Sequence, residues 1–318
     1  MDILNLLSSG TPVSGEHIAR SLRISRAAVH KRILRLRKQG YTIIGHKNLG
    51  YSLLTRPDRL TREEIAAYLP PTNALQYDLN HYDTTESTQT LAKDMAIKGK
   101  EEGAVFIAEK QTFAYGRMRR EWASPEGGIW FSVLLRPPIL PDAAVPITFL
   151  MSLAICKSIE EYTRLVPAIK WPNDVLIGGK KVAGILTEMS AEVGKVNWVI
   201  AGAGINVNNA LPGFLRDQAV SLSAATGQVI HRAPLFASLL NHFSAMYRAF
   251  CNEGFGPFAT EYNQRSCIIG KPVLVNAGNQ VLRGTAEQID GEGYLWLTCE
   301  DGTSKRIIAG DVQFHPAN

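Results

Sequence analysis

The stretch Lys170–Glu188, KWPNDVLIGGKKVAGILTE, decides how the middle of the chain folds. Two apolar runs, Val175–Ile177 and Val182–Leu186, flank Gly178–Gly179. Two glycines between apolar runs predict a tight hairpin, because both turn positions can adopt positive φ. Gly184 interrupts the second run, and a missing side chain inside a strand indicates close approach of a ligand or of another backbone.

The predicted hairpin carries polar residues near both of its ends. Asn173 and Asp174 precede the first run, and Lys180 and Lys181 precede the second. A lysine on a strand that leads into a core must reach solvent or meet an anion. An anion site and a solvated surface lysine are both compatible with this stretch alone.

Length and composition set the class of protein. A chain of 318 residues with 45% apolar residues is long enough for two or three domains. The longest apolar runs are expected to be far too short to cross a bilayer, and the N-terminus lacks the basic start and small-residue cleavage site of a signal peptide. Four cysteines without CxxC spacing argue against a zinc site and a disulfide framework. We therefore expect a cytoplasmic protein with no metal-ligating cluster and no membrane partner.

Charge is concentrated at the N-terminus. Residues 1–57 carry ten lysines and arginines against two carboxylates, a net +8, so the rest of the chain carries −3 of the total of +5. Ser14 and Ser25 are typical N-caps for two helices, the second of which is Arg26–Lys38. A basic helix after two short helices predicts a helix-turn-helix whose last helix enters the major groove.

A strand pair, Tyr41–Ile44 and Tyr51–Leu54, predicts a wing beside that helix. A three-helix domain with a merely solvated basic face is the alternative to DNA binding. The predicted DNA contacts are Ser25, Arg26, His30, Lys31, Arg35 and Lys47. A linker, Leu54–Arg59, follows.

The middle of the chain alternates strands and helices. A capping box at Thr61 and Glu64 opens a helix expected to reach Leu69. Predicted helices are Ser87–Ile97, Ile147–Leu165, Ser221–Thr226 and Pro234–Phe250; predicted strands are Ala104–Glu109, Ile129–Arg136 and Val196–Ala201, with one more ending at Tyr82–Asp83. The glycines at 202 and 204 lack the third glycine of a dinucleotide-binding loop, so such a site is not expected.

The sequence pattern of the last part of the chain changes from alternating strands and helices to strands alone. Residues 270–316 contain short alternating strands, with turns at Gly278-Asn279, Asp290-Gly291 and Asp301-Gly302. This pattern predicts a small β-barrel-like domain. The predicted strands are Lys271–Asn276, Gln280–Gln288, Tyr294–Cys299 and Ser304–Ile308.

A loop rich in arginine lies between two predicted strands. It reads QTFAYGRMRREW, Gln111–Trp122, and Ser124–Pro125 follow it. Guanidinium groups bind phosphate and carboxylate in a bidentate manner, and glycine lets backbone N–H groups approach an anion. From the loop alone, an anion site and an exposed basic loop stay open.

These motifs together resemble the bifunctional biotin–protein ligases that also repress the biotin operon. The resemblance rests on Ser87–Gln89, the arginine loop, KWPND at Lys170–Asp174, Lys180–Gly184 and Gly202–Asn206, which stand in the family's order. It implies a winged helix-turn-helix at 1–57, a mixed-sheet, class II synthetase-like ligase domain at 61–268 and an SH3-like domain at 269–318. The fold class is therefore multidomain α/β (α+β).

The resemblance also implies an activity. The family joins biotin to ATP, with Mg²⁺, to give biotinyl-5′-AMP, and passes the biotinyl group to a lysine of a carboxyl carrier domain. Adenylate is expected to promote a homodimer that binds operator DNA of biotin genes. Residues carried over as catalytic are Lys181, Arg117 and Asp174.

Binding residues are carried over in the same way. For biotin they are Ser87, Thr88, Gln89, Gln111, Tyr115, Gly116, Arg117, Lys181, Gly184 and Gly202. For ATP and the adenylate they are Arg117, Arg120, Trp122, Asn173, Lys181 and Asn206.

Four positions depart from the usual family pattern: Gln89, Ala114, Tyr115 and Arg119. They bear on how the arginine loop orders and how firmly the adenylate is kept. Two other functions fit parts of the pattern, a lipoate–protein ligase and a ligand-sensing transcription factor without catalysis. Retention of Lys181, Arg117 and Asp174 favours chemistry over a pure sensor.

Overall fold

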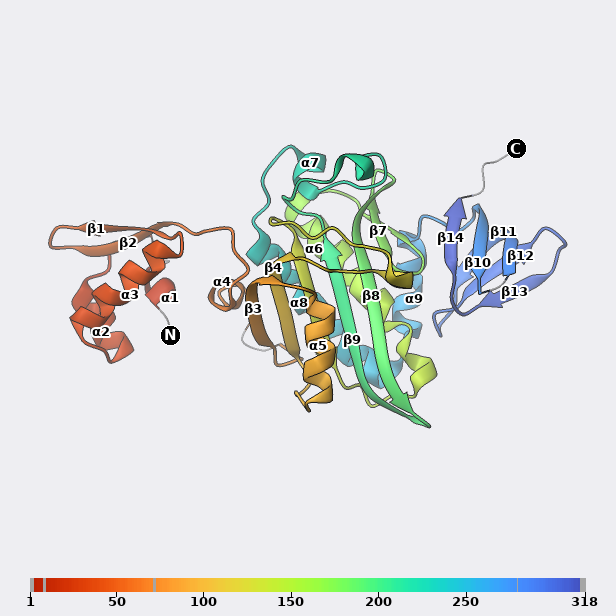
Figure 1. The fold of residues 1–318 in the computed structure, drawn as a ribbon, viewed down its shortest axis with the longest axis horizontal. Helices are drawn as coiled ribbons and strands as arrows, with labels where there is room; N and C mark the ends of the chain where they lie inside the picture. Colours follow the sequence, from red (N-terminus) through yellow and green to blue (C-terminus); the bar gives the residue numbers. More distant parts are fainter. Residues whose placement is uncertain (1–2, 8–9, 71–72, 279, 315–318) are drawn as a thin grey trace. The chain divides into compact units, whose positions relative to one another are not determined.

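The chain divides after Arg59 into two units, Met1–Arg59 and Leu60–Asn318. They are described here from a computed structural model, which covers residues 3–7, 10–70, 73–278 and 280–314. Figure 1 shows the order of the elements along the chain.

The first unit is three helices followed by a β-hairpin. Its elements are α1 (Ile3–Leu7), α2 (Gly15–Leu22), α3 (Arg26–Lys38), β1 (Thr42–His46) and β2 (Gly50–Thr55). The predicted caps are confirmed, because Ser14 Oγ accepts the His17 N–H and Ser25 Oγ accepts the Ala28 N–H, both at 3.1 Å. This is the predicted winged helix-turn-helix.

Helix α3 has one buried and one exposed side. Val29 and Ile33 are buried in the core of this unit with Leu4, Leu7 and Ile18. Each such side chain contributes roughly 1.5–3 kcal/mol by leaving water. Every predicted DNA contact lies on the exposed surface: Ser25, Arg26, His30, Lys31, Arg35 and Lys47.

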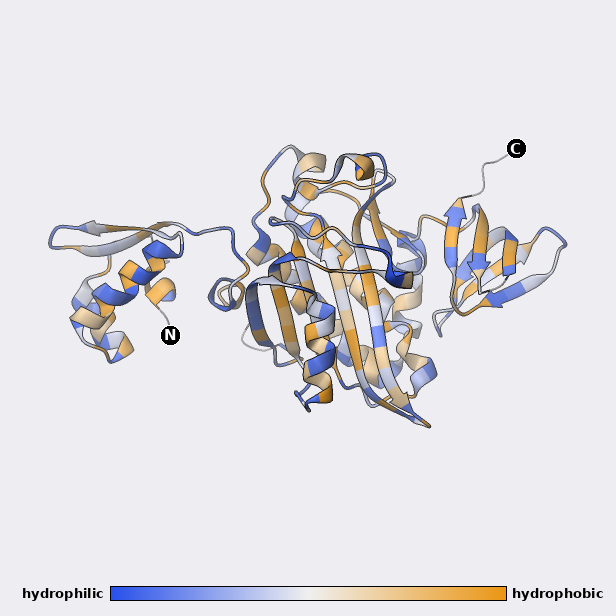
Figure 2. Cartoon of the chain, viewed as in Figure 1, coloured by the Kyte–Doolittle hydropathy of each residue, from blue (hydrophilic) through white to orange (hydrophobic). Residues whose placement is uncertain are grey.

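A mixed seven-stranded sheet organises the second unit. Its order is β3-β4-β5-β9-β8-β7-β6, and only β3 and β4 pair in parallel. The strands are β3 (Asp78–Thr85), β4 (Ala104–Gln111), β5 (Ile129–Leu135), β6 (Ala168–Lys170), β7 (Asp174–Ile177), β8 (Lys180–Glu192) and β9 (Lys195–Ile205). In Figure 2 the edge strand β3 is mainly hydrophilic, whereas its neighbour β4 is hydrophobic.

Helices cover the two faces of this sheet (Figure 1). Helix α5 (Thr88–Ile97) packs on one face, over Phe106, Leu134 and Ile200. The other face carries α6 (Ile147–Thr163) and α8 (Arg232–Glu253). The remaining helices are α4 (Arg62–Ala66), α7 (Leu222–Thr226) and α9 (Gly256–Arg265).

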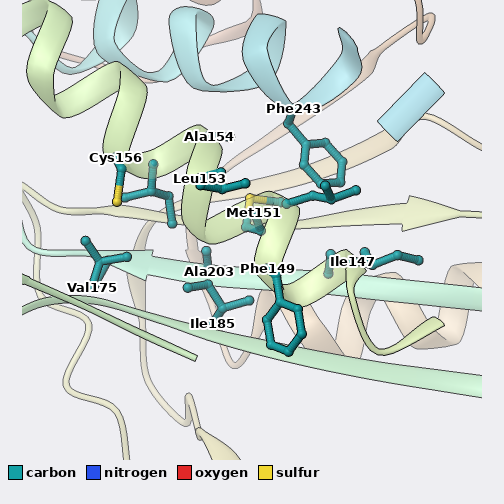
Figure 3. Packing of buried hydrophobic residues seen from close by; sticks show 14 of the residues in the cluster. Ile147, Phe149, Met151, Leu153, Ala154, Cys156, Val175, Ile185, Ala203 and Phe243 are labelled. Atoms are coloured by element: carbon teal, nitrogen blue, oxygen red, sulfur yellow. The ribbon is translucent and has the colours of Figure 1, made fainter. Parts of the chain in front are cut away.

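Helix α6 is apolar on nearly all sides because it lies between the sheet and α8. Figure 3 shows Val175, Ile185 and Ala203 of the strands beneath it and Phe243 of α8 above it. The stretch Pro141–Thr163 is long and apolar enough to cross a membrane, so the sequence estimate of apolar run lengths was too low. Of its most apolar window, 72% is buried inside the protein, as expected for a core helix.

The central hairpin is confirmed. Strands β7 and β8 pair in antiparallel fashion with Ile177 opposite Lys180, so Gly178 and Gly179 form a two-residue turn. Their φ angles are 56° and 79°, which side-chain-bearing residues adopt only with strain. A register shift between Val175 and Leu176 marks a bulge near the lysine pair.

The C-terminal part forms a five-stranded antiparallel sheet of order β13-β12-β11-β10-β14. Its strands are β10 (Pro272–Ala277), β11 (Gln280–Ile289), β12 (Leu295–Cys299), β13 (Ser304–Ile307) and β14 (Asp311–Phe314). Four of these match predicted strands; β14 was missed. Residue 279 of the predicted Gly278-Asn279 turn lies outside the described residues.

Several predicted boundaries were wrong. Helix α4 ends at Ala66 rather than Leu69, and β3 continues past Asp83 to Thr85. Strand β9 runs to Ile205, so the glycine-rich segment is strand rather than loop. Its pairing with β5 and β8 overrides the low strand preference of glycine. Helix α9 was not predicted.

A buried carboxylate ties the start of the second unit to its sheet. Glu109 Oε1 accepts the Leu60 N–H at 2.8 Å and lies 3.1 Å from His81 Nε2, while Oε2 pairs with Arg232 at 2.8 Å. Burial alone would raise the pKa of Glu109. The hydrogen bond from His81, the charge of Arg232 and the Leu60 N–H outweigh it and lower the pKa to about 2.

We expect Glu109→Gln to reduce the free energy of unfolding by about 3 kcal/mol at pH 7. A carboxyl whose folded pKa is depressed stabilises the fold above its unfolded pKa, 4.5, and that contribution is lost as pH falls towards about 2. The difference in the free energy of unfolding between wild type and variant, measured by urea unfolding, should therefore become smaller below pH 4.5. Glu101→Gln, at an exposed carboxylate, is the control; a difference that stays constant with pH would contradict this prediction.

Candidate functional site

A cleft of about 590 Å³ opens where the ends of β4, β7, β8 and β9 meet the arginine loop and β14. It gathers every residue that the sequence analysis assigned to catalysis, biotin or adenylate. These are Ser87, Thr88, Gln89, Gln111, Tyr115, Gly116, Arg117, Arg120, Trp122, Asn173, Asp174, Lys181, Gly184, Gly202 and Asn206.

One end of the cleft is a buried polar network at the N-terminus of α5. Ser87 caps the helix by accepting the Thr90 N–H. Gln111 Oε1 accepts the Thr88 N–H at 2.8 Å and the Thr88 hydroxyl at 3.1 Å, and Gln111 Nε2 donates to Ser124 Oγ at 3.0 Å. These bonds fix which way the Gln111 amide points.

Hydrogen bonds also fix the orientation of the Gln89 side-chain amide. Its Nε2 donates to Glu188 Oε2 at 3.0 Å, and its Oε1 accepts the Ser132 hydroxyl at 3.0 Å. Gly202 makes this possible, since a Cβ there would stand 2.2 Å from Gln89 Oε1. Fixed amides and hydroxyls of this kind offer donors and acceptors to a cyclic urea.

The middle of the cleft holds a lysine between a carboxylate and an indole. Lys181 Nζ lies 2.6 Å from Asp174 Oδ1 and 5.0 Å from the centre of the Trp122 ring. The indole packs closely against β8 and β9: a Cβ on Gly184 would stand 2.9 Å and one on Gly204 2.4 Å from Trp122. The groups that approach Gly184 closely are the side chains of Trp122 and Lys181, not the ligand or second backbone that the sequence predicted.

The arginine loop is folded over the cleft. Tyr115 and Glu121 form an isolated β-bridge, and the Gly116 N–H donates to the Arg120 carbonyl at 2.8 Å. At its tip Met118 and Arg119 both have φ near +57°, a left-handed conformation that is uncommon for such residues. Arg119, a departure from the family pattern, stacks over Tyr115, another departure, at 4.4 Å.

Two arginines of this loop contact the C-terminal sheet. Arg117 donates to the Gly310 carbonyl at 3.1 Å and lies 3.1 Å from Asp311 Oδ1. Arg120 lies 2.9 Å from Asp311 Oδ2. One carboxylate thereby pairs with both guanidinium groups and leaves the cluster with a net positive charge, an arrangement that the sequence analysis did not foresee.

Asn173 and Asn206, which were predicted to contact the nucleotide, also form hydrogen bonds within the protein. Asn173 Nδ2 donates to the Ile185 carbonyl at 3.0 Å, and Asn173 Oδ1 accepts from Arg117 at 3.2 Å. Asn206 is buried, and its Oδ1 accepts from Asn209 Nδ2 at 3.0 Å. These hydrogen bonds hold residues of the cleft wall in place.

Sequence reasoning missed Ser132, Glu188 and Asp311. Ser132 is the one polar residue in the strand IWFSVLL, an available signal that was not used. Glu188 lies two residues beyond the apolar run of the hairpin, also on β8. Asp311 stands in no recognisable motif, so no local signal could have identified it.

A mixed sheet with a lysine–carboxylate pair, an arginine loop and a separate winged helix-turn-helix defines a carboxylate-activating ligase joined to a DNA-binding domain. Comparison with known protein families agrees. Residues 1–52 match an HTH domain, residues 82–206 match the biotin/lipoate A/B protein ligase family, and residues 268–315 match the biotin protein ligase C terminal domain.

Similar proteins narrow this class. The bifunctional ligase/repressor BirA of Bacillus subtilis (strain 168) is 39% identical, over 98% of this chain and 97% of that protein. The Escherichia coli (strain K12) protein of the same name is 28% identical over 100% of this chain and 97% of its own. The chain therefore belongs to the family of bifunctional biotin ligase/repressor proteins.

A solved structure shares the fold of the ligase part. The biotin protein ligase from Aquifex aeolicus, in complex with biotin and ATP, superposes with a TM-score of 0.66 at 27% identity. The match covers 76% of this chain and 99% of that one.

Proposed function

We propose that this protein is a biotin–protein ligase that uses biotin and ATP to biotinylate a lysine of a carboxylase carrier domain, and that it also represses biotin genes. The observation that carries the ligase half is the single cleft. It joins the polar side chains around Gln89 and Gln111, the pair of Lys181 with Asp174, and two arginines suited to phosphate. Full-length similarity to ligase/repressor proteins supports both halves.

In the first step a carboxylate oxygen of biotin attacks the α-phosphorus of ATP. A P–O bond forms, the bond to the β-phosphate oxygen breaks, and pyrophosphate leaves with the Mg²⁺ that accompanied ATP as substrate. Lys181 faces both anions and stabilises the negative charge that develops on the phosphoryl oxygens. Arg117 and Arg120 neutralise the phosphate oxygens.

In the second step the acceptor lysine amine attacks the acyl carbon, an amide forms, and AMP leaves. Asp174 receives or orients the proton that the amine loses. Its carboxylate is available for this role because substrate anions that bind Lys181 release Asp174 from the ion pair. Trp122 provides an aromatic face near the adenine, and Asn173 and Asn206 hold the nucleotide side of the cleft. Ser87, Thr88, Gln89, Gln111, Tyr115, Gly116, Gly184 and Gly202 shape the biotin pocket.

The functional division that we propose is 1–57 for DNA binding, 61–268 for ligation and 269–318 as a C-terminal domain. Operator DNA would be bound by a homodimer that the adenylate promotes, since a dimer presents two recognition helices to a two-fold site. The four cysteines are free thiols, in keeping with a cytoplasmic location.

The direct test is ATP-dependent transfer of biotin to a carrier domain, with lipoate as competitor. We expect transfer of biotin that excess lipoate does not suppress. Transfer of lipoate instead would make the protein a lipoate ligase, and no transfer of either would leave only a sensor.

We expect Arg117→Gly to weaken retention of biotinyl-5′-AMP by about 10- to 100-fold, since a charge-assisted hydrogen bond contributes roughly 1.5–3 kcal/mol. The released intermediate should then label lysines of bystander proteins. Calorimetry with biotinyl-5′-AMP measures the affinity, and biotinylation of serum albumin measures the escape. Lys98→Ala, which removes an exposed cation outside the cleft, should retain the adenylate. Equal affinity in Arg117→Gly and the parent would contradict this role.

A further inference from the structure

Asp311 holds the two guanidinium groups that the proposed function assigns to phosphate. Its two carboxylate oxygens lie 3.1 Å from Arg117 and 2.9 Å from Arg120. Gly310 adds a carbonyl oxygen 3.1 Å from Arg117. Together these atoms present three oxygens to two arginines, which is the arrangement that a phosphate group also offers.

The position of Asp311 makes this contact part of the fold. Asp311 is the first residue of β14 and pairs in register with Asn276 of β10. Both residues line the cleft. The side chains of Asp311 and Arg117 are about three-quarters covered, at 25% and 28% exposure, so water screens their attraction less than it would for a surface pair.

The negative charge of Asp311 affects how a phosphate group can bind in the cleft. A phosphate that binds Arg117 and Arg120 would come close to the Asp311 carboxylate. The two anions would then repel each other. The donors of Arg117 and Arg120 that now contact Asp311 and Gly310 would have to be shared with the phosphate or released to it. Biotin in the pocket beside Gln89 and Gln111 would meet no such conflict.

We propose that Asp311 is an internal substitute for the substrate phosphate: it orients Arg117 and Arg120 towards the cleft and gives them up when a phosphate arrives. This rests on the proposed phosphate role of the two arginines. Two consequences follow: Asp311 selectively lowers affinity for phosphate-bearing ligands, and phosphate binding detaches β14 from the arginine loop. Asp311 is thus a positioning residue of the nucleotide site.

The test is Asp311→Asn, which keeps the size of the side chain and one acceptor but removes the charge. We expect AMP and pyrophosphate to bind about tenfold more tightly to the variant in calorimetry, with the affinity for biotin alone unchanged. Asp311→Glu, which retains the charge, should behave as wild type. Asp301→Asn removes an exposed carboxylate from the turn between β12 and β13 and serves as the matched control.

Unchanged or weaker binding of AMP and pyrophosphate to Asp311→Asn would overturn the inference and leave Asp311 as a fixed structural contact. If that variant melts well below wild type, Asp311→Ser gives the same charge change with a smaller side chain and must shift affinity in the same direction. Wild-type biotin transfer is measured in parallel. Its absence would refute the proposed function, whereas its presence with unchanged phosphate affinity would refute only the role of Asp311.

Discussion

Lys181→Ala is expected to slow formation of biotinyl-5′-AMP by about 10²–10³-fold, as removal of a preorganised charge from a developing anion typically does. The geometry explains the size of the effect. Lys181 lies 2.6 Å from Asp174 and beside Trp122, in a cleft where Gly184 and Gly204 leave space only for that packing. The group is thereby fixed before substrate arrives, so its loss is felt in the transition state.

Pyrophosphate release in single-turnover assays measures this step directly. Lys180→Ala is the matched control, because the neighbouring lysine donates to the Arg216 carbonyl on the outside of the hairpin. The melting temperature of the Lys181 variant should shift little, because the side chain lies in the cleft rather than in the core. Pyrophosphate release at the wild-type rate would remove Lys181 from the chemistry.

The elements that the sequence predicted well are those set by local interactions. The Gly178–Gly179 turn, the caps at Ser14, Ser25 and Ser87, and the apolar period of α3 depend on residues a few positions apart. Local rules decide such features because a turn needs positive φ and a helix end needs an acceptor. The residues carried over from the resemblance all line one cleft, and their roles stay predictions.

The elements that the sequence did not predict depend on partners far along the chain. Arg120 and Asp311 are 191 positions apart, and nothing near either residue indicates the other. Strand β9 continues through Gly202 and Gly204 because Leu186 and Gly184 of β8 pair with them. The same glycines then admit Gln89 and Trp122, so an apparent loop motif is the floor of the site.

Binding of this protein to a biotin-operon promoter is expected to depend on both salt and adenylate. The first unit carries ten cationic side chains between residues 1 and 57, and the predicted DNA-binding residues on α3 and the wing are exposed. Each phosphate that they neutralise should add roughly −0.9 to the slope of log affinity against log salt. A dimer presents two such surfaces to the DNA, so adding biotin with ATP should tighten binding and steepen that slope.

Gel-shift titrations at several salt concentrations, with and without biotin plus ATP, measure both effects. Arg26→Ala with Lys31→Ala should reduce operator affinity by at least tenfold and flatten the salt slope by about one unit for each phosphate that is no longer neutralised. Lys93→Ala with Lys98→Ala removes the same charge from α5 and the residue after it, in the second unit, and should leave binding unchanged. Equal promoter occupancy with and without biotin plus ATP, or unaltered binding by the α3 variant, would eliminate the repressor half and leave the ligase.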